Sequence, residues 1–176
     1  MRSRLFLGFA TGLLTLTAMR VVAQDVNFPS RRALIVNNCP FIELSAFSFK
    51  NKYSNGGFRL EQDLTWKNVG TQPVVAFEIV VLKYDPFNRR LVGTRWTVPG
   101  RNSGDWSPLA VGESNADGTI GLNDEKVLTA IAYIRNARLA DGTVWTADDV
   151  DLLRRLRQLS TGIPDFGDVK PDTPRP

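Results

Sequence analysis

The sequence predicts an all-β protein, an antiparallel β-sandwich of about seven strands followed by one C-terminal α-helix. Three observations predict this class. Short apolar segments rich in β-branched and aromatic residues recur along the chain, separated by Gly, Asn and Pro. Apolar and polar side chains alternate with a period of two in residues 58–68. The spacing changes to that of an amphipathic helix in residues 146–159.

The sandwich is expected to cover residues 41–145, preceded by a lead-in segment over residues 24–40. Residues 41–51 have the alternation of a first strand. In that strand one side would carry Phe41, Glu43, Ser45, Phe47 and Phe49. Asn55-Gly56 supplies the positive φ of a tight hairpin turn, so a second strand follows directly.

Residues 58–68 form the clearest predicted strand. Its apolar side carries Phe58, Leu60, Leu64 and Trp66, with Gln62 as the one polar exception. The opposite side is polar or charged at every position, as expected for a strand with one face in water.

The second half of the predicted sandwich contains a central strand. Residues 74–85 are apolar on both faces, which is typical of a strand covered on each side. Residues 91–99 form a further strand, 100–121 a loop-rich segment, and 126–139 a long strand. Asp141-Gly142 then turns the chain into a short return strand at residues 143–145.

The C-terminal region is predicted as a helix and a tail. Thr146 is a candidate N-cap, with Asp149 as its capping-box partner. Acidic residues at the start of 146–159 and arginines near its end complement the helix dipole. Residues 160–176 are rich in Pro, Asp and Gly, so we expect a flexible tail.

Residues 1–23 have the three-part layout of a signal peptide. Arg2 and Arg4 precede an apolar stretch over residues 5–19, and Val21-Val22-Ala23 resembles a cleavage site before Gln24. The alternative is an uncleaved membrane anchor in which residues 5–23 span the bilayer with Arg20 snorkelling. The sequence favours cleavage, and therefore an exported protein of the periplasm or cell envelope. If the segment were retained as an anchor, the domain that it holds would face the periplasm.

Composition narrows the possible chemistry. Three of the 22 basic residues and none of the 18 acidic residues lie in residues 1–23, so the rest carries 19 basic and 18 acidic side chains. That balance gives no electrostatic reason to expect nucleic-acid binding. The chain has no histidine, and its single cysteine, Cys39, cannot form an internal disulfide. Cys39 is expected to be a small buried residue near the first strand.

The turns and strands carry a family resemblance over residues 41–139. The segments are Trp66 to Gly70, Val74 to Asp85, Leu91-Val92-Gly93 and Pro108 to Ser114. They resemble the bacterial immunoglobulin-like FxLYD-type domains of exported proteins. Lys83 separates Leu82 from Tyr84 in the Tyr-Asp motif, and Val111 stands where those domains usually have Pro. The resemblance implies an immunoglobulin-like sandwich and a non-enzymatic, often membrane-associated module, and it brings no catalytic residue.

Candidate binding residues lie in a loop and in the helix. Trp106, among Gly, Ser, Asn and Asp, is a candidate aromatic anchor for a partner. A second candidate is the arginine cluster Arg154, Arg155 and Arg157, which is otherwise a solvated helix face. Arg31-Arg32 and Arg89-Arg90 would form another basic patch, but no sequence feature places the two pairs together.

No catalytic, cofactor or metal site is predicted. Residues 115–126 contain acids and glycines without the ligand spacing of an EF-hand, so a solvated loop is favoured over a weak Ca²⁺ site. The sequence therefore predicts a non-enzymatic exported envelope protein that binds another protein. One alternative is a membrane-anchored accessory subunit docked on the periplasmic face of a membrane complex. Another is a carbohydrate- or ligand-binding module.

Overall fold

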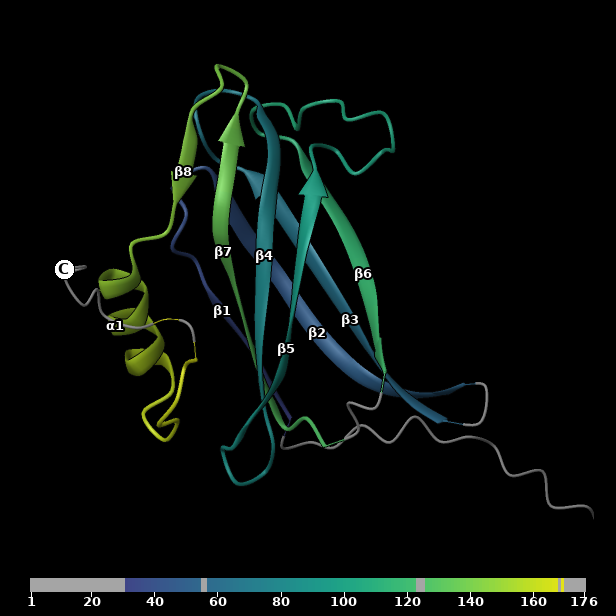
Figure 1. Cartoon of the computed structure of the whole chain (residues 1–176). Helices are drawn as coiled ribbons and strands as arrows, with labels where there is room; N and C mark the ends of the chain where they lie inside the picture. The colour runs from purple at the N-terminus through teal and green to yellow at the C-terminus, as the bar shows by residue number, and fades with distance from the viewer. Residues whose placement is uncertain (1–30, 55–56, 123–125, 168, 170–176) are drawn as a thin grey trace, which may run out of the picture.

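The structure, a computed structural model, describes residues 31–54, 57–122, 126–167 and 169. Within these residues the chain forms eight strands and one helix, with the strands in two stacked sheets (Figure 1). The elements are β1 (Arg32–Val36), β2 (Ile42–Ser54), β3 (Gly57–Asn68), β4 (Val74–Tyr84), β5 (Arg90–Pro99), β6 (Ser114–Leu122), β7 (Thr129–Leu139), β8 (Val144–Thr146) and α1 (Asp149–Leu159). The prediction of an all-β sandwich with one C-terminal helix is confirmed.

The larger sheet has the strand order β1-β7-β4-β5, with β8 also paired to β7, and the smaller sheet has the order β2-β3-β6. β4 is central, as its apolar faces predict, and lies between β7 and β5. β1 pairs with β7 in parallel, unlike the other pairs of described strands. Because β1 lies within residues 24–40, the prediction that all of this lead-in stays outside the sandwich is wrong.

The main core fills the space between the two sheets. Trp66 is fully buried and meets Phe77 edge-on, with ring centroids 5.4 Å apart. Leu60, Gln62 and Leu64 also point inward, so the alternation predicted for β3 is confirmed; the side chain of Phe58 lies outside the described residues. Cys39 is buried as expected, and burial raises the pKa of its thiol.

β2 departs from strict alternation. A β-bulge shifts its register against β3 between Leu44 and Ala46. Ile42 and Leu44 are therefore buried, whereas Glu43 and Ser45 are exposed. The prediction that Glu43 and Ser45 share a face with Phe49 is wrong, because the extra residue of a bulge reverses the facing of the strand on one side of it.

β6 lies within the segment expected to be loop-rich. Its nine residues pair with β3 in unbroken register from Ser114 to Leu122. At Gly118 a Cβ would lie 2.8 Å from Asp63 Oδ1 and 3.1 Å from the Gln62 carbonyl oxygen, so glycine leaves room for β3 there. Most residues of β6 have low strand propensity, so pairing with β3 decides its conformation.

α1 covers part of the outer face of the larger sheet. It starts at Asp149, and the Asp148 carboxylate caps it by accepting a 2.7 Å hydrogen bond from the Asp151 amide. The prediction of Thr146 as the cap is wrong, because Thr146 belongs to β8. Leu152, Leu153 and Leu156 pack on apolar side chains of β4 and β7 and form a second core.

The residues after α1 continue this second core. Residues 160–167 and 169, which we call the C-terminal strap, bury Ile163, Phe166 and Val169. The Tyr84 hydroxyl donates a 3.0 Å hydrogen bond to the carbonyl of Asp165. The prediction of a flexible tail is therefore wrong for the strap, and residues 168 and 170–176 lie outside the described residues.

Candidate functional site

Trp106 lies at one end of the sandwich, in the connection between β5 and β6. We call residues 100–113 the Trp106 loop; it is at the top of Figure 1. The side chain of Trp106 is 61% exposed, as the sequence predicts. Its backbone is left-handed, with a φ of 61°.

A left-handed backbone is uncommon for a bulky residue. It brings Cβ close to the carbonyl oxygen and costs roughly 1–2 kcal/mol for such a residue, whereas glycine, and to a lesser degree asparagine, tolerates it. Such a conformation persists only where the surrounding structure determines it. The contacts of the loop therefore have to hold Trp106 in this position.

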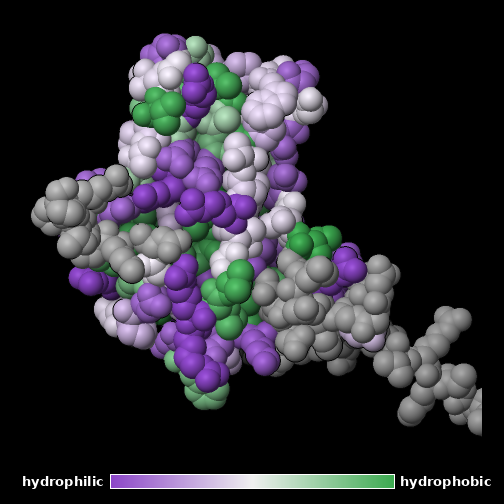
Figure 2. Space-filling view, viewed as in Figure 1, coloured by the Kyte–Doolittle hydropathy of each residue, from purple (hydrophilic) through white to green (hydrophobic). Residues whose placement is uncertain are grey.

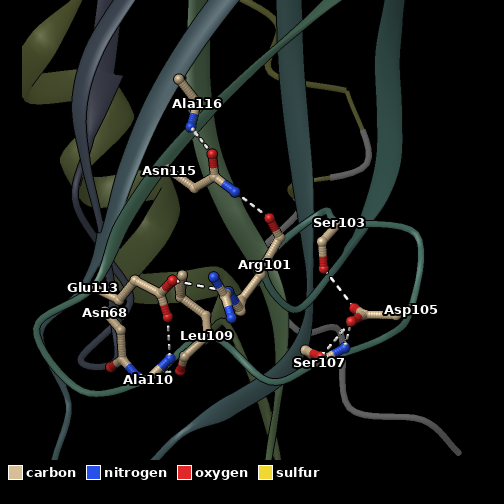
Figure 3. Close-up of polar contacts among 10 residues, drawn as sticks. All are labelled: Asn68, Arg101, Ser103, Asp105, Ser107, Leu109, Ala110, Glu113, Asn115 and Ala116. Atoms are coloured by element: carbon tan, nitrogen blue, oxygen red, sulfur yellow. Dashed lines mark hydrogen bonds and ion pairs between the residues drawn. The ribbon is translucent and has the colours of Figure 1, made fainter.

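Asp105 provides the first set of contacts (Figure 3). Its carboxylate accepts hydrogen bonds from the Ser103 hydroxyl, from the Ser107 hydroxyl at 2.7 Å and from the Ser107 amide at 2.9 Å. These bonds stabilise the charged form, so the pKa of Asp105 lies well below its usual range. The carboxylate thus clamps the residues on either side of Trp106.

The two arms of the loop meet at its base. The Arg101 amide donates to the Ser107 carbonyl at 2.9 Å, and the Asn102 amide donates to the Pro99 carbonyl at 2.7 Å. Gly100 has a φ of 48°, and a Cβ there would lie 2.0 Å from the Ser107 carbonyl oxygen. Only glycine fits at this crossing.

Side chains of the loop also bind the start of β6 and its flanking turn. Arg101 Nε forms a 3.0 Å ion pair with Glu113 Oε1, and Glu113 Oε2 accepts a 2.8 Å bond from the Ala110 amide (Figure 3). Asn102 Nδ2 donates to Asp117 Oδ2 at 2.7 Å, and Asn115 Nδ2 donates to the Arg101 carbonyl.

The fully buried Asn68 forms the floor beneath the loop. Its Nδ2 donates to the carbonyls of Gln72 and Leu109, both at 3.0 Å, and its Oδ1 accepts from the Gly70 amide at 2.9 Å. Leu109, itself fully buried, exchanges two backbone hydrogen bonds with Val74 at the start of β4. The loop is therefore fixed to the core strand that lies beside β5.

The arrangement suits binding more than bond-making chemistry. A flat aromatic side chain stands in water on a platform that is already ordered, so a partner that covers it loses little conformational entropy. Val111 and Val69, 53% and 46% exposed, lie on the loops at the same end.

The predicted arginine cluster is not part of this end. Arg154 and Arg155 both form ion pairs with Asp151 on α1, the second at 2.6 Å. Arg155 also reaches the carbonyl of Asn37 at 3.4 Å. Arg157 is exposed in the last turn of α1. The structure thus separates the arginines from Trp106, and it partly neutralises two of them.

Sequence reasoning missed one juxtaposition. Arg32 pairs with Thr129, Thr129 with Tyr84, and Tyr84 with Arg90, so the two arginines lie in one row across the larger sheet. Both arginine pairs are visible in the sequence. Their proximity depends on strand order and register, which no local pattern encodes.

Two further findings concern the described residues only. Their helix is too short and too polar to cross a membrane, and residues 5–23 lie outside them. They also contain no group of three or more His, Cys, Asp or Glu side chains that could hold a metal ion.

No protein-family model and no curated protein matches the chain. Among solved structures, it is similar to the X-ray structure of a hypothetical protein from Peptoclostridium difficile 630, with a TM-score of 0.48 and 11% sequence identity. The similarity covers 69% of this chain and 92% of that one.

Proposed function

We propose that the chain is a non-enzymatic protein of the cell envelope that binds another protein through the Trp106 loop. The observation that carries this proposal is Trp106 itself, 61% exposed and left-handed on a loop fixed by side-chain hydrogen bonds. A strained backbone that presents a large aromatic to water has no evident role in stabilising the fold.

Export is supported by the sequence of residues 1–23 and by the resemblance to domains of exported proteins. The absence of histidine from the whole chain supports a role in binding, because histidine is the commonest general acid and base.

The partner would bury Trp106 in an apolar pocket, with Val111 and Val69 nearby and charged side chains such as Arg101 around the rim. The side chain has few rotatable bonds and its backbone is already fixed. Little conformational entropy is therefore lost on binding, so most of the free energy released by burying the Trp106 ring contributes to affinity.

Photo-crosslinking in the native envelope tests this directly. The full-length protein carries a photoreactive phenylalanine analogue at position 106 or, as a control, at position 53, where Tyr53 is also 61% exposed but lies at the opposite end. We expect a discrete protein adduct from position 106 only. Equal adducts from both positions, or none from position 106, would contradict the proposal.

The glycan alternative is separated by a second measurement. If Trp106→Ala abolishes retention of the protein on immobilised envelope polysaccharide, and position 106 yields no protein adduct, the loop is a carbohydrate site. The matched Tyr53→Ala variant should leave retention unchanged in either case.

A membrane-anchored accessory subunit is the second candidate, and the path of the chain is compatible with it. The chain enters the described sandwich at Arg31, at the end opposite the Trp106 loop. An anchor formed by residues 5–23 would therefore present Trp106 away from the membrane, toward the exposed part of a membrane complex.

A further inference from the structure

The turn between β4 and β5 carries a rigidly held phenylalanine at the end opposite the Trp106 loop. Phe87 is 76% exposed at this turn. The buried Asp85 carboxylate accepts hydrogen bonds from the Phe87 amide at 2.8 Å and the Arg89 amide at 2.9 Å, and from Arg89 Nε at 2.7 Å. The Arg89 guanidinium also lies over the Phe87 ring, 5.1 Å from its centroid. The phenyl ring thus projects from an ordered turn whose Asp85 and Arg89 are paired with each other, directly before Arg90.

Basic residues of separate strands lie at the same end of the sandwich as this turn. The register of the larger sheet places Arg32 on β1 and Arg90 on β5 in one row, three strand spacings or about 14 Å apart. Lys126 is exposed beside that row, where the Leu128 amide donates to the Tyr84 carbonyl. The row therefore places positive charge across this end of the larger sheet.

The β2–β3 hairpin adds to the same end, which is at the bottom of Figure 1. It contributes Lys50 and Lys52, both ion-paired to Glu61, and also Arg59. We call the following residues the basic end: Arg32, Lys50, Lys52, Arg59, Phe87, Arg89, Arg90 and Lys126. Figure 2 shows hydrophilic side chains over the lower part of the molecule and hydrophobic atoms at its lowest tip.

Among the described residues, acidic side chains do not balance this charge; Asp124 and Glu125, which precede Lys126, lie outside them. Asp85 is buried and paired with Arg89, Glu61 is shared by two lysines, and Asp165 is the remaining exposed acid described near the turn. The opposite end has the reverse balance. Its acids are Glu43, Asp105, Glu113, Asp117 and Asp141, and its bases are Lys67, Arg101 and Arg138.

The path of the chain indicates that the basic end would face the bilayer. β1 begins there, at Arg32, so the polypeptide that precedes the described residues joins the sandwich at this end. During export, or permanently if residues 5–23 are retained as an anchor, this end would be the part of the domain nearest the bilayer.

We propose that the basic end is a docking surface for a membrane rich in anionic phospholipid. Lys and Arg side chains near such a surface are attracted by the lipid phosphates, each contributing about fivefold to binding. Phe87 inserts among the headgroups, at the depth that aromatic side chains favour. A convex turn with one projecting ring fits a flat, deformable surface better than it fits a preformed pocket.

The test places an environment-sensitive fluorophore on the projecting ring. In the full-length chain, Phe87→Cys is labelled with a nitrobenzoxadiazole; the native thiol, Cys39, is buried. The protein is reconstituted with vesicles of phosphatidylcholine, with or without phosphatidylglycerol. We expect a blue-shifted emission, quenched by nitroxide-labelled lipid, in the anionic vesicles only.

A matched pair of variants isolates the role of charge. Arg32→Glu with Lys126→Glu alters the basic end, and Lys67→Glu with Arg138→Glu makes the same change in net charge at the opposite end. The first pair should raise the anionic lipid fraction needed for half of the emission shift, or weaken the partition of the label by about tenfold or more. The second pair should change it less than about twofold.

Three results would overturn the proposal. They are a label at position 87 that stays in water in anionic vesicles, an equal response in neutral vesicles, and equal effects of the two charge variants. A fluorophore at Trp106→Cys should remain in water in all vesicles. If it entered the bilayer instead, the Trp106 loop and not the basic end would face the membrane. The proposal does not depend on partner binding by Trp106, because the crosslinking at position 106 and the fluorescence at position 87 can fail separately.

Discussion

At position 106 the chain holds a tryptophan in a backbone conformation that glycine adopts without steric cost. Asn88 and Asn102 are also left-handed, but asparagine tolerates that region better than a bulky aromatic does. The exposure of Trp106 could be predicted from its Gly, Ser, Asn and Asp neighbours. Its left-handed backbone could not, because the Asp105 clamp and the Gly100 crossing create it, and both depend on the folded loop.

Replacing Trp106 by glycine and by alanine separates backbone strain from the side chain. Both variants lose the same exposed ring, but only glycine relieves the left-handed strain. We expect Trp106→Gly to be more stable than Trp106→Ala by about 1 kcal/mol, after the larger unfolded-state entropy of glycine is allowed for. Urea unfolding measures the difference. Equal stabilities, or a less stable glycine variant, would mean that the loop does not impose the conformation.

Among the elements, the C-terminal strap differs most from its prediction. Ile163, Phe166 and Val169 recur every third residue among Pro, Gly and Asp. That spacing is visible in the sequence, but it fits no regular element, and the second core that receives it forms only when β4, β7 and α1 assemble. Composition alone therefore predicts disorder where the strap packs.

Truncating the strap tests its contribution to stability. Phe166 is buried and meets Tyr84 edge-on, with ring centroids 6.5 Å apart. We expect Phe166→Ala to lower the free energy of unfolding by about 3–5 kcal/mol, whereas the exposed Thr161→Ala should change it by less than about 0.5 kcal/mol. Chemical denaturation of both variants provides the comparison. A small loss of stability in Phe166→Ala would mean that the C-terminal strap is only loosely held and contributes little to the free energy of unfolding.

The ion pairs of Asp151 on α1 should make the stability of the protein depend on pH. Hydrogen bonds from Arg155 and Arg154 lower the pKa of Asp151 below its usual value. A carboxyl with a depressed pKa in the folded state stabilises the protein above its unfolded pKa of about 3.9, and that stabilisation is lost as the pH falls through the folded value.

We therefore expect Asp151→Asn to have a lower Tm than the parent chain at neutral pH and to approach it below about pH 4. Thermal unfolding followed across this range, with the exposed Glu43→Gln as a control for loss of one acid, measures the effect. A constant gap between parent and variant at every pH would contradict the ion-pair explanation.

The strands fall into two groups: some are determined by consecutive residues, and others only by a partner strand that is distant in sequence. β3 and β4 could be predicted because alternation in one, and apolar character on both faces of the other, are properties of consecutive residues. β6 could not, because Ser, Asn, Asp and Gly become a strand only beside β3. β1 could not be predicted as part of the sandwich, because its parallel partner β7 is distant in sequence. The row from Arg32 to Arg90 was inaccessible for the same reason.

At the scale of the whole molecule, the sandwich has two unlike ends. The Trp106 loop carries an exposed aromatic and an excess of acids, and the basic end carries Phe87 and an excess of bases. β5 connects them directly, and its ten residues span roughly 30 Å at 3.3 Å per residue. A partner at Trp106 and a surface at Phe87 would therefore be engaged simultaneously without competing.

The state of the N-terminus decides how the two ends are used. We expect the mature protein, isolated from its native envelope, to begin at Gln24 and to be released from membranes by high salt, because screening weakens the attraction of the basic end. Intact mass and N-terminal sequencing of the soluble and membrane fractions measure this. A chain that still begins at Met1 and resists salt would favour the anchored accessory subunit.

The parallel pairing of β1 with β7 has a mechanical consequence. If residues 5–23 held the chain at the bilayer while a partner pulled on the Trp106 loop, tension would enter through Arg31 and run along β1. Its five paired residues would then be loaded together in shear, because force and strand axis coincide, and their hydrogen bonds would not open one at a time as in an unzipping hairpin. If the proposed anchor and the proposed partner both hold, the first strand of the sandwich would transmit force between them without unravelling.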